Sequence, residues 1–345
     1  MGWDWRGVLG DGGRRVGMVA RRSGAVCSAF GQCVRAVRSG CAFGLSLQLP
    51  DHGAPGGLVH TAAAMDTIVV CAALASALLH AGWNAAVKAS PWAARVMTAQ
   101  MQAAAVMVLP ILAWDGLPTP AAWPWMLSST TLCLVAVAAM LRAYEHGPFG
   151  AVYPLMRASS VLLVLPVASW LAQERPALLG VAGVLLIAGA VASLALGANA
   201  RQAFNRRALA WTLLAATCTA GYVVCDGQGV KRTGSPWSYG AGMSVLNAIG
   251  WTWWQSRRGQ AWPTDKAVWA WGLPVAAASV LSYLLILWAW TRAPIAPAAA
   301  LRDTSAVFAA LLSVWVLKEP LSRRVLVAVL LAAAGAVLIR LGWPK

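Results

Sequence analysis

The feature that most constrains this chain is an apolar hairpin that occurs twice along the sequence. One copy lies between residues 143 and 197, and the other begins at Ala289. Each copy has two long apolar segments joined by a short turn that carries a Glu. A helix of about twenty residues is roughly 30 Å long, which matches the hydrocarbon core of a bilayer. The sequence therefore predicts a membrane helical hairpin in two copies.

The two copies correspond residue by residue when the sequence is shifted by 145 positions, the distance from residue 157 to residue 302. The corresponding pairs are Arg157 and Arg302, Ser160 and Ser305, Trp170 and Trp315, and Glu174 and Glu319. The copies also differ, because Tyr153-Pro154 is replaced by Ala298-Ala299 and Ala158 by Asp303. We therefore do not expect the two half-sites to be equivalent.

Composition places the chain among integral membrane proteins. Hydrophobic residues make up 59% of it and charged residues 11%, whereas soluble proteins average about 25% charged residues. The net charge of +16 comes largely from loops and the N-terminal tail, as in many membrane proteins, so we expect no nucleic-acid partner. The seven Cys have no C-x-x-C spacing, so we expect no metal site, cofactor or disulfide framework.

Apolar length and turn residues predict ten membrane spans after residue 65. They cover 67–87, 95–114, 123–143, 150–171, 177–197, 208–229, 236–254, 267–290, 295–317 and 323–343. We expect an all-α integral membrane protein with two five-helix repeats, 65–200 and 201–345. Because five is an odd number, the second repeat enters the membrane from the opposite side. Inverted repeats of this kind are common in secondary transporters.

Residues 1–64 do not resemble the rest of the chain. They are rich in Arg and Gly and contain no apolar run long enough to span a membrane. We interpret them as a disordered tail, or as residues that precede a true start at Met65. In both cases we expect a chain that begins at Met65 to insert into the membrane.

Two motifs give the chain its resemblance to a known family. The first predicted span contains L-L-H-A-G-W-N-A-A-V-K (78–88), and the fourth opens with H-G-P-F-G-A-V-Y-P-L-M-R (146–157). With the Glu that ends spans four and nine, these motifs resemble ten-span members of the drug/metabolite transporter superfamily, of the EamA type. The resemblance covers residues 66–343. It implies a transporter of a small metabolite or drug-like molecule in the cytoplasmic membrane. The direction of transport and the oligomeric state stay open, and we expect an exporter that is a monomer or a homodimer.

The alternatives to a transporter are a membrane-embedded transferase and a channel. A transferase would normally carry acidic or His clusters at a loop, or a large soluble domain, and a channel would need a filter-like sequence. Neither feature stands out, so we expect no enzymatic activity. An ATP-driven pump is excluded for this chain alone, because it has no G-x-x-x-x-G-K-[ST] motif.

Polar residues inside the predicted spans are the functional candidates, since a mid-bilayer charge is costly unless it faces a cavity or a partner. His80, Asn84 and Lys88 share one face of the first span, because residues four apart lie one above the other on a helix. Tyr222 and Asp226 have the same spacing in the sixth span. The candidate substrate-binding residues are Trp83, Asn84, Tyr153, Arg157, Ser160, Tyr222, Asp226 and Arg302.

Several of these residues have a structural interpretation as well. Asn84 could bond a neighbouring helix, Lys88 could extend to the interface, and His80 could simply fill the core. Asp226 is a candidate carrier of a coupling proton, but it could also be the counter-ion of an Arg or lie near the interface. For two further pairs of charged residues at the ends of spans we favour a structural role over a functional one. Glu174 and Glu319 are expected in turn or capping roles, and Arg142 and Glu145 are expected to form a local pair.

The two Arg of the repeat are expected to face one central cavity. We expect Arg157→Ala to abolish transport with normal expression. Arg302→Ala should do less, because the adjacent Asp303 should partly neutralise Arg302. Orientation is less constrained, since Lys and Arg are more frequent in the odd-numbered connections, whereas the resembled family has both termini inside. We expect both termini in the cytoplasm.

Overall fold

The structure of the protein is a computed structural model. It describes residues 66–147, 149–174, 177–195, 206–257, 259, 262–263, 265–317 and 322–342. The predictions for the tail 1–64, for Glu319 and for the side chain of Lys88 fall outside this described part.

All secondary structure in the described residues is helical, as the composition predicts. The helices are α2 (Thr67–Ala89), α3 (Ala93–Met107), α4 (Leu109–Asp115), the short 3₁₀ helix η2 (Pro120–Ala122), α5 (Trp123–His146), α6 (Phe149–Leu171), α7 (Leu178–Ala195), α9 (Arg206–Thr233), α10 (Pro236–Arg257), α11 (Lys266–Arg292), α12 (Ile295–Asp303), α13 (Ser305–Leu317) and α14 (Arg323–Gly342). Eight segments in this part of the chain are long and apolar enough to cross a membrane, and α7 supplies a shorter apolar helix. The helix positions agree with the ten predicted spans to within a few residues.

Two of the predicted spans are each built from two helices. The α3–α4 break falls at Val108, just before Pro110, because proline lacks an N–H and clashes with the preceding turn. The second break separates α12 from α13 at Thr304. The predicted span over 295–317 is therefore present as two consecutive helices. The buried Thr304 hydroxyl donates to the Leu301 carbonyl over 2.6 Å, and Thr side chains compete with the helix for backbone carbonyls in this way.

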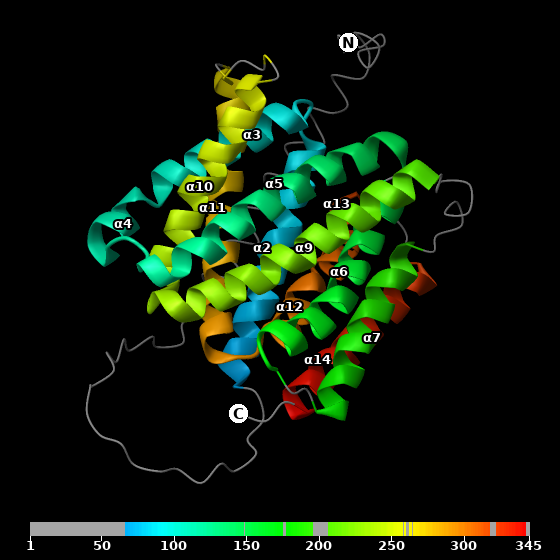
Figure 1. The fold of residues 1–345 in the computed structure, drawn as a ribbon. Coiled ribbons are helices and arrows are strands. Elements are labelled where there is room, and N and C mark those ends of the chain that lie inside the picture. Colours follow the sequence, from blue (N-terminus) through cyan, green and yellow to red (C-terminus); the bar gives the residue numbers. More distant parts are fainter. Residues whose placement is uncertain are drawn as a thin grey trace, which may run out of the picture.

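The last helices of the two predicted repeats, α7 and α14, lie side by side along one edge of the molecule (Figure 1). Two glycines make this contact close. A Cβ on Gly183 would lie 2.7 Å from the Gly335 carbonyl oxygen, and one on Gly335 would lie 2.7 Å from the Gly183 carbonyl oxygen. Only residues without a side chain allow such an approach, which increases the packing contact between helices in a membrane.

Helices of the first half also pack against helices of the second half in the centre. α2 lies against α11, and α5 runs alongside α9 (Figure 1). Ser76 of α2 donates to the Ser282 carbonyl over 2.7 Å, and Ser282 donates to the Ser76 carbonyl over 2.8 Å. The two halves are therefore interleaved, and any space at the centre is bounded by both.

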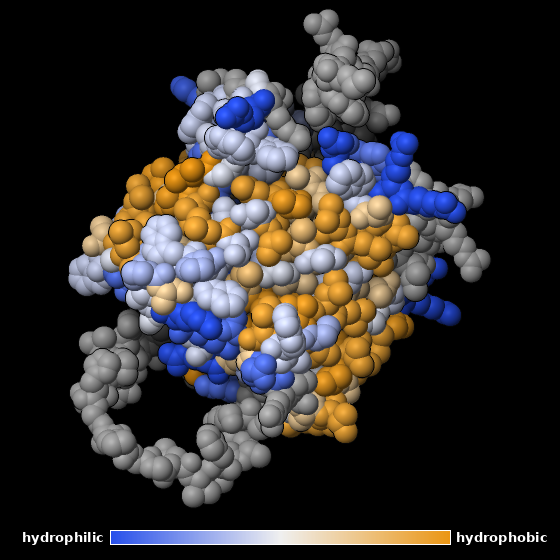
Figure 2. Space-filling model, in the orientation of Figure 1, coloured by the Kyte–Doolittle hydropathy of each residue, from blue (hydrophilic) through white to orange (hydrophobic). Residues whose placement is uncertain are grey.

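The outer surface is that of a membrane protein. Figure 2 shows hydrophobic side chains over much of one face, with hydrophilic side chains gathered toward the helix ends. Large apolar side chains remain exposed on several helices, among them Trp170, Leu185, Leu213 and Leu330. In water such a surface would drive aggregation, whereas in a bilayer it contacts lipid. The chain is a multi-pass helical membrane protein.

Candidate functional site

A cavity of about 200 Å³ lies at the centre of the bundle. Its walls come from both halves, namely α2, α3, α5 and α6 of the first and α9, α10, α11 and α12 of the second. Seven of the eight candidate residues line it: Trp83, Asn84, Tyr153, Arg157, Tyr222, Asp226 and Arg302. The eighth, Ser160, is not in its wall, and its hydroxyl hydrogen bonds to Asp303 instead. Residues that are distant in the sequence are thus brought to one cavity.

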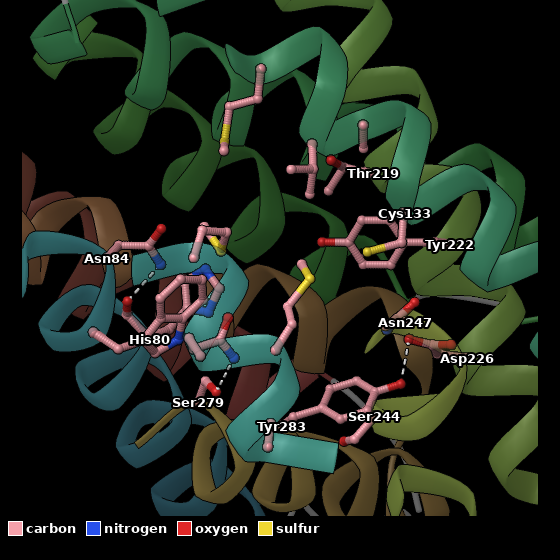
Figure 3. Close-up of a pocket in the computed structure, with 18 of the residues that line it drawn as sticks. His80, Asn84, Cys133, Thr219, Tyr222, Asp226, Ser244, Asn247, Ser279 and Tyr283 are labelled. Carbon is pink, nitrogen blue, oxygen red and sulfur yellow. Dashed lines mark hydrogen bonds between the residues drawn. The ribbon is translucent and has the colours of Figure 1, made fainter. Parts of the chain in front are cut away.

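Asp226 is bound by three hydroxyl groups. Its Oδ1 accepts hydrogen bonds from Ser129 Oγ at 2.5 Å and from Tyr239 OH at 3.1 Å. Its Oδ2 accepts one from Tyr283 OH at 2.8 Å, and Figure 3 shows Tyr283 directed at the carboxylate. The side chain is buried. Within the described residues it forms no ion pair with Lys or Arg.

These contacts describe the surroundings of Asp226. Among the described residues it has no Arg within ion-pair distance, and its side chain is buried. It is a carboxylate held by neutral donors from α5, α10 and α11, at the wall of the cavity. A carboxyl group in this setting can take up and release a proton without breaking an ion pair.

Arg157 is paired across the two halves with Asp303. Its Nε lies 3.2 Å from Asp303 Oδ1, and both side chains are almost fully buried. Ser160 Oγ donates to the Arg157 carbonyl over 2.9 Å and also lies within hydrogen-bond distance of the other oxygen of Asp303, at 3.2 Å. The contact is ionic rather than an aligned hydrogen bond, since Arg157 Nε and Nη2 have no hydrogen-bond acceptor among the described residues.

Asp303 therefore forms its close ion pair with Arg157 and not with its neighbour Arg302, and the partial neutralisation of Arg302 stays a prediction. Consecutive residues of a helix do not face each other, because they project about 100° apart around the axis. Asp303 points toward α6 of the first half, and Arg302 points into the cavity. Asp303, which takes the place of Ala158 in the second copy, is thus the ion-pair partner of Arg157 in the first copy.

Arg302 makes a single weak polar contact in the described part of the chain. Its Nη2 lies 3.4 Å from His80 Nδ1, and its Nε has no hydrogen-bond partner. His80 in turn packs edge-on against Trp83, with ring centroids 4.9 Å apart. His80 is therefore not merely a core-filling residue, because its ring lines the cavity and contacts a buried guanidinium.

The remaining candidates lie around these charges. Asn84 donates to the His80 carbonyl over 2.7 Å (Figure 3), so it bonds its own helix and not a neighbouring one. Tyr153 OH lies 3.4 Å from Ser305 Oγ, across the two halves. The sequence reasoning missed Ser129, Tyr239 and Tyr283, because a lone hydroxyl residue in an apolar span carries no pattern that marks its partner.

Glu174 connects the halves at the end of α6. Its carboxylate accepts hydrogen bonds from the backbone N–H groups of Ile295, at 2.5 Å, and Ala296, at 3.2 Å. Lys231 Nζ lies 3.9 Å away. The capping role predicted for Glu174 is confirmed, and the capped helix is α12 of the other half. The local pair of Arg142 and Glu145 is also present, at 4.0 Å.

Replacing Glu174 by alanine is expected to lower the free energy of unfolding by about 1–3 kcal/mol. The change leaves two N–H groups of α12 without an acceptor and removes the carboxylate near Lys231. Thermal unfolding of the purified protein in detergent measures the effect. Glu145→Ala is the control, because that carboxylate is half-exposed in a loose pair and should contribute less than about 1 kcal/mol. Equal destabilisation by the two changes would contradict the prediction.

Comparisons with known proteins agree with the expected class. Residues 206–341 match the EamA-like transporter family. One solved structure, described only as "Crystal structure of protein", shares the fold with a TM-score of 0.62 at 18% sequence identity. The match covers 79% of this chain and 95% of that chain. No curated protein sequence matches the chain.

Proposed function

Residues 206–341 form an EamA-like transporter domain, and on this premise we propose that the chain is a secondary transporter of a small molecule. The observation that carries the proposal is the central cavity, whose wall contains Arg157, Asp226 and Arg302. Charged groups within membrane spans are rare and mostly face a substrate or ion pathway. We place the protein in the cytoplasmic membrane as an exporter, as a monomer or homodimer.

The helix contacts support two inverted repeats. Exchanging the halves puts the first span (α2) in the place of the sixth (α9). It also puts the third span (α5) in the place of the eighth (α11). The contact between α2 and α11 then becomes the contact between α9 and α5, and both contacts are present. The pair of α7 and α14 is exchanged with itself. This is the pattern expected of a pseudo-two-fold axis between the halves, and transporters of this type bind their substrate at such an axis.

In a transporter that works by alternating access, contacts between the halves can hold the cavity closed on one side. The Arg157–Asp303 pair and the Glu174 cap of α12 both connect α6 to α12. Opening the cavity to the side of the membrane on which Glu174 lies requires at least the cap to break. The break at Thr304, directly after Arg302 and Asp303, gives α12 a point at which to move relative to α13. Discontinuous helices beside the binding site are common in secondary transporters.

The eight candidate residues have different roles in this proposal. Trp83, Asn84, Tyr153, Tyr222 and Arg302 contact the substrate, and Asp226 carries the coupling proton. Arg157 holds Asp303 and lines the wall, and Ser160 supports Asp303 from behind. No cofactor takes part.

Uptake into proteoliposomes is expected to test the proposal. Radiolabelled organic acids, amines and neutral alcohols of similar size are offered with and without an imposed pH gradient. A secondary transporter concentrates at least one of them above its external level when the gradient is present, and does not alter it chemically. A solute that only equilibrates would indicate a channel, and a converted solute would indicate an enzyme. Either result overturns the proposal.

A further inference from the structure

We propose that Arg302 binds the carboxylate of the transported solute, so that the substrate is a small organic monoanion with an apolar body. This inference rests on the proposed transport function and names its substrate class. The two Arg at the cavity differ in their counter-ions. Arg157 has Asp303 as a counter-ion at 3.2 Å, whereas Arg302 forms no ion pair with a described carboxylate.

The buried guanidinium of Arg302 is left incompletely satisfied. Only 8% of the residue is exposed. Among the described residues its Nε has no hydrogen-bond partner, and its one polar contact is His80 Nδ1 at 3.4 Å. A buried cation without an anion or a full set of acceptors is strongly destabilising. Because Arg stays protonated in proteins, it cannot relieve this cost by losing its proton. An anion supplied from outside the chain would relieve it.

Neither carboxylate near the cavity is available for Arg302. Asp303 is directed at Arg157 and receives Ser160 at its second oxygen. Asp226 is occupied on both oxygens, by Ser129 and Tyr239 on Oδ1 and by Tyr283 on Oδ2. When Asp226 carries a proton, the two Arg and Asp303 leave one unit of positive charge at the cavity, which corresponds to a monoanion.

The chemistry of the group favours a carboxylate. A guanidinium presents its N–H donors in a planar fork that matches the two oxygens of a carboxylate. The neighbouring walls are apolar, with Trp83, Met140, Met156 and Val280 among the lining residues. Such walls accept an aliphatic or aromatic body, and thioether side chains adapt to its shape. The small volume of the cavity limits that body to about one ring or a short chain.

The inference predicts selective stabilisation of the detergent-solubilised protein by one of three matched compounds. Phenylacetate, phenethylamine and 2-phenylethanol share a ring and chain and differ in their anionic, cationic or neutral end. A ligand that binds the folded protein raises its unfolding temperature. We expect phenylacetate to raise this temperature in the unmodified protein and the other two compounds to have little effect.

Three variants assign the effect to Arg302. In Arg302→Gln the half-saturating phenylacetate concentration should rise by about tenfold or more, because a charge-assisted pair is lost. Arg302→Lys keeps the charge without the fork and should give an intermediate value. Arg292→Gln is the matched control at the exposed end of α11, where the side chain stacks on Trp288, and it should behave as the unmodified protein.

Two results would overturn the inference. One is a phenylacetate response that is unchanged in Arg302→Gln, and the other is a response in the unmodified protein that is absent or no larger than that to phenethylamine or 2-phenylethanol. The comparison of the three compounds in the unmodified protein decides the matter even if Arg302→Gln does not fold. Because binding is measured without transport, the two proposals fail separately. Carboxylate-selective binding with no uptake would remove the transporter proposal alone.

Discussion

Replacing Arg157 by methionine is expected to lower the free energy of unfolding by about 3–5 kcal/mol. The change removes the partner of Asp303 and leaves an uncompensated carboxylate that is 6% exposed at the centre of the bundle. Breaking a buried pair in this way is among the most destabilising single changes. Thermal unfolding in detergent and the yield of folded protein measure it. The earlier expectation of normal expression for Arg157→Ala is revised accordingly, because the sequence does not reveal the partner of Arg157.

A second substitution separates this pairing role from other roles of Arg157. In Arg157→Met with Asp303→Leu neither position of the pair carries a charge, and most of the lost stability should return, because apolar pairs often replace buried ion pairs at little cost. The exposed pair of Arg95 and Asp265, at 2.5 Å with half-exposed side chains, is the control. Arg95→Met should change stability by no more than about 1 kcal/mol. Continued instability of the double variant would show that the guanidinium is needed for more than holding Asp303.

Asp226→Asn is expected to abolish uptake driven by a pH gradient. An amide cannot bind and release a proton, so no proton flow can be coupled to the solute. Its single carbonyl oxygen also cannot replace both carboxylate oxygens, which accept from Ser129, Tyr239 and Tyr283. Rates of gradient-driven uptake and of solute exchange in proteoliposomes measure the effect. We expect uptake to fall to background while exchange between equal solute concentrations continues, since exchange needs no net proton movement.

The pattern of loss distinguishes coupling from folding. Asp265→Asn removes an exposed carboxylate far from the cavity wall and should leave both rates unchanged. Loss of both uptake and exchange in Asp226→Asn, with a normal unfolding temperature, would indicate that Asp226 binds the solute itself. Uptake that still responds to the pH gradient in this variant would contradict the proposed coupling role.

The two Arg of the repeat, Arg157 and Arg302, have different partners in the structure. The sequence placed Arg157 first because its neighbour is Ala158 and the neighbour of Arg302 is Asp303. In the structure Asp303 reaches across to Arg157, and Arg302 faces the cavity without an ion-pair partner among the described residues. The proposed contact with the carboxylate of the solute is therefore at Arg302.

The sequence by itself determined the membrane class, the helix positions and the composition of the site. Apolar segments of bilayer length, interrupted by turn residues, allow almost no other structure, because backbone groups in lipid must be satisfied within a helix or a closed barrel. For the same reason, polar residues inside those segments were expected at a cavity, and Trp83, Asn84, Tyr153, Arg157, Tyr222, Asp226 and Arg302 line one.

Only the tertiary structure decided which of these residues are partners. The pairing of Arg157 with Asp303 and the capping of α12 by Glu174 join positions that are more than a hundred residues apart. Helical periodicity shows which residues share a face, but not which neighbouring helix that face meets. That choice depends on close contacts such as Gly183 with Gly335, where packing sets how the helices approach. The same packing leaves the buried Arg302 without an ion pair to any carboxylate that the structure describes.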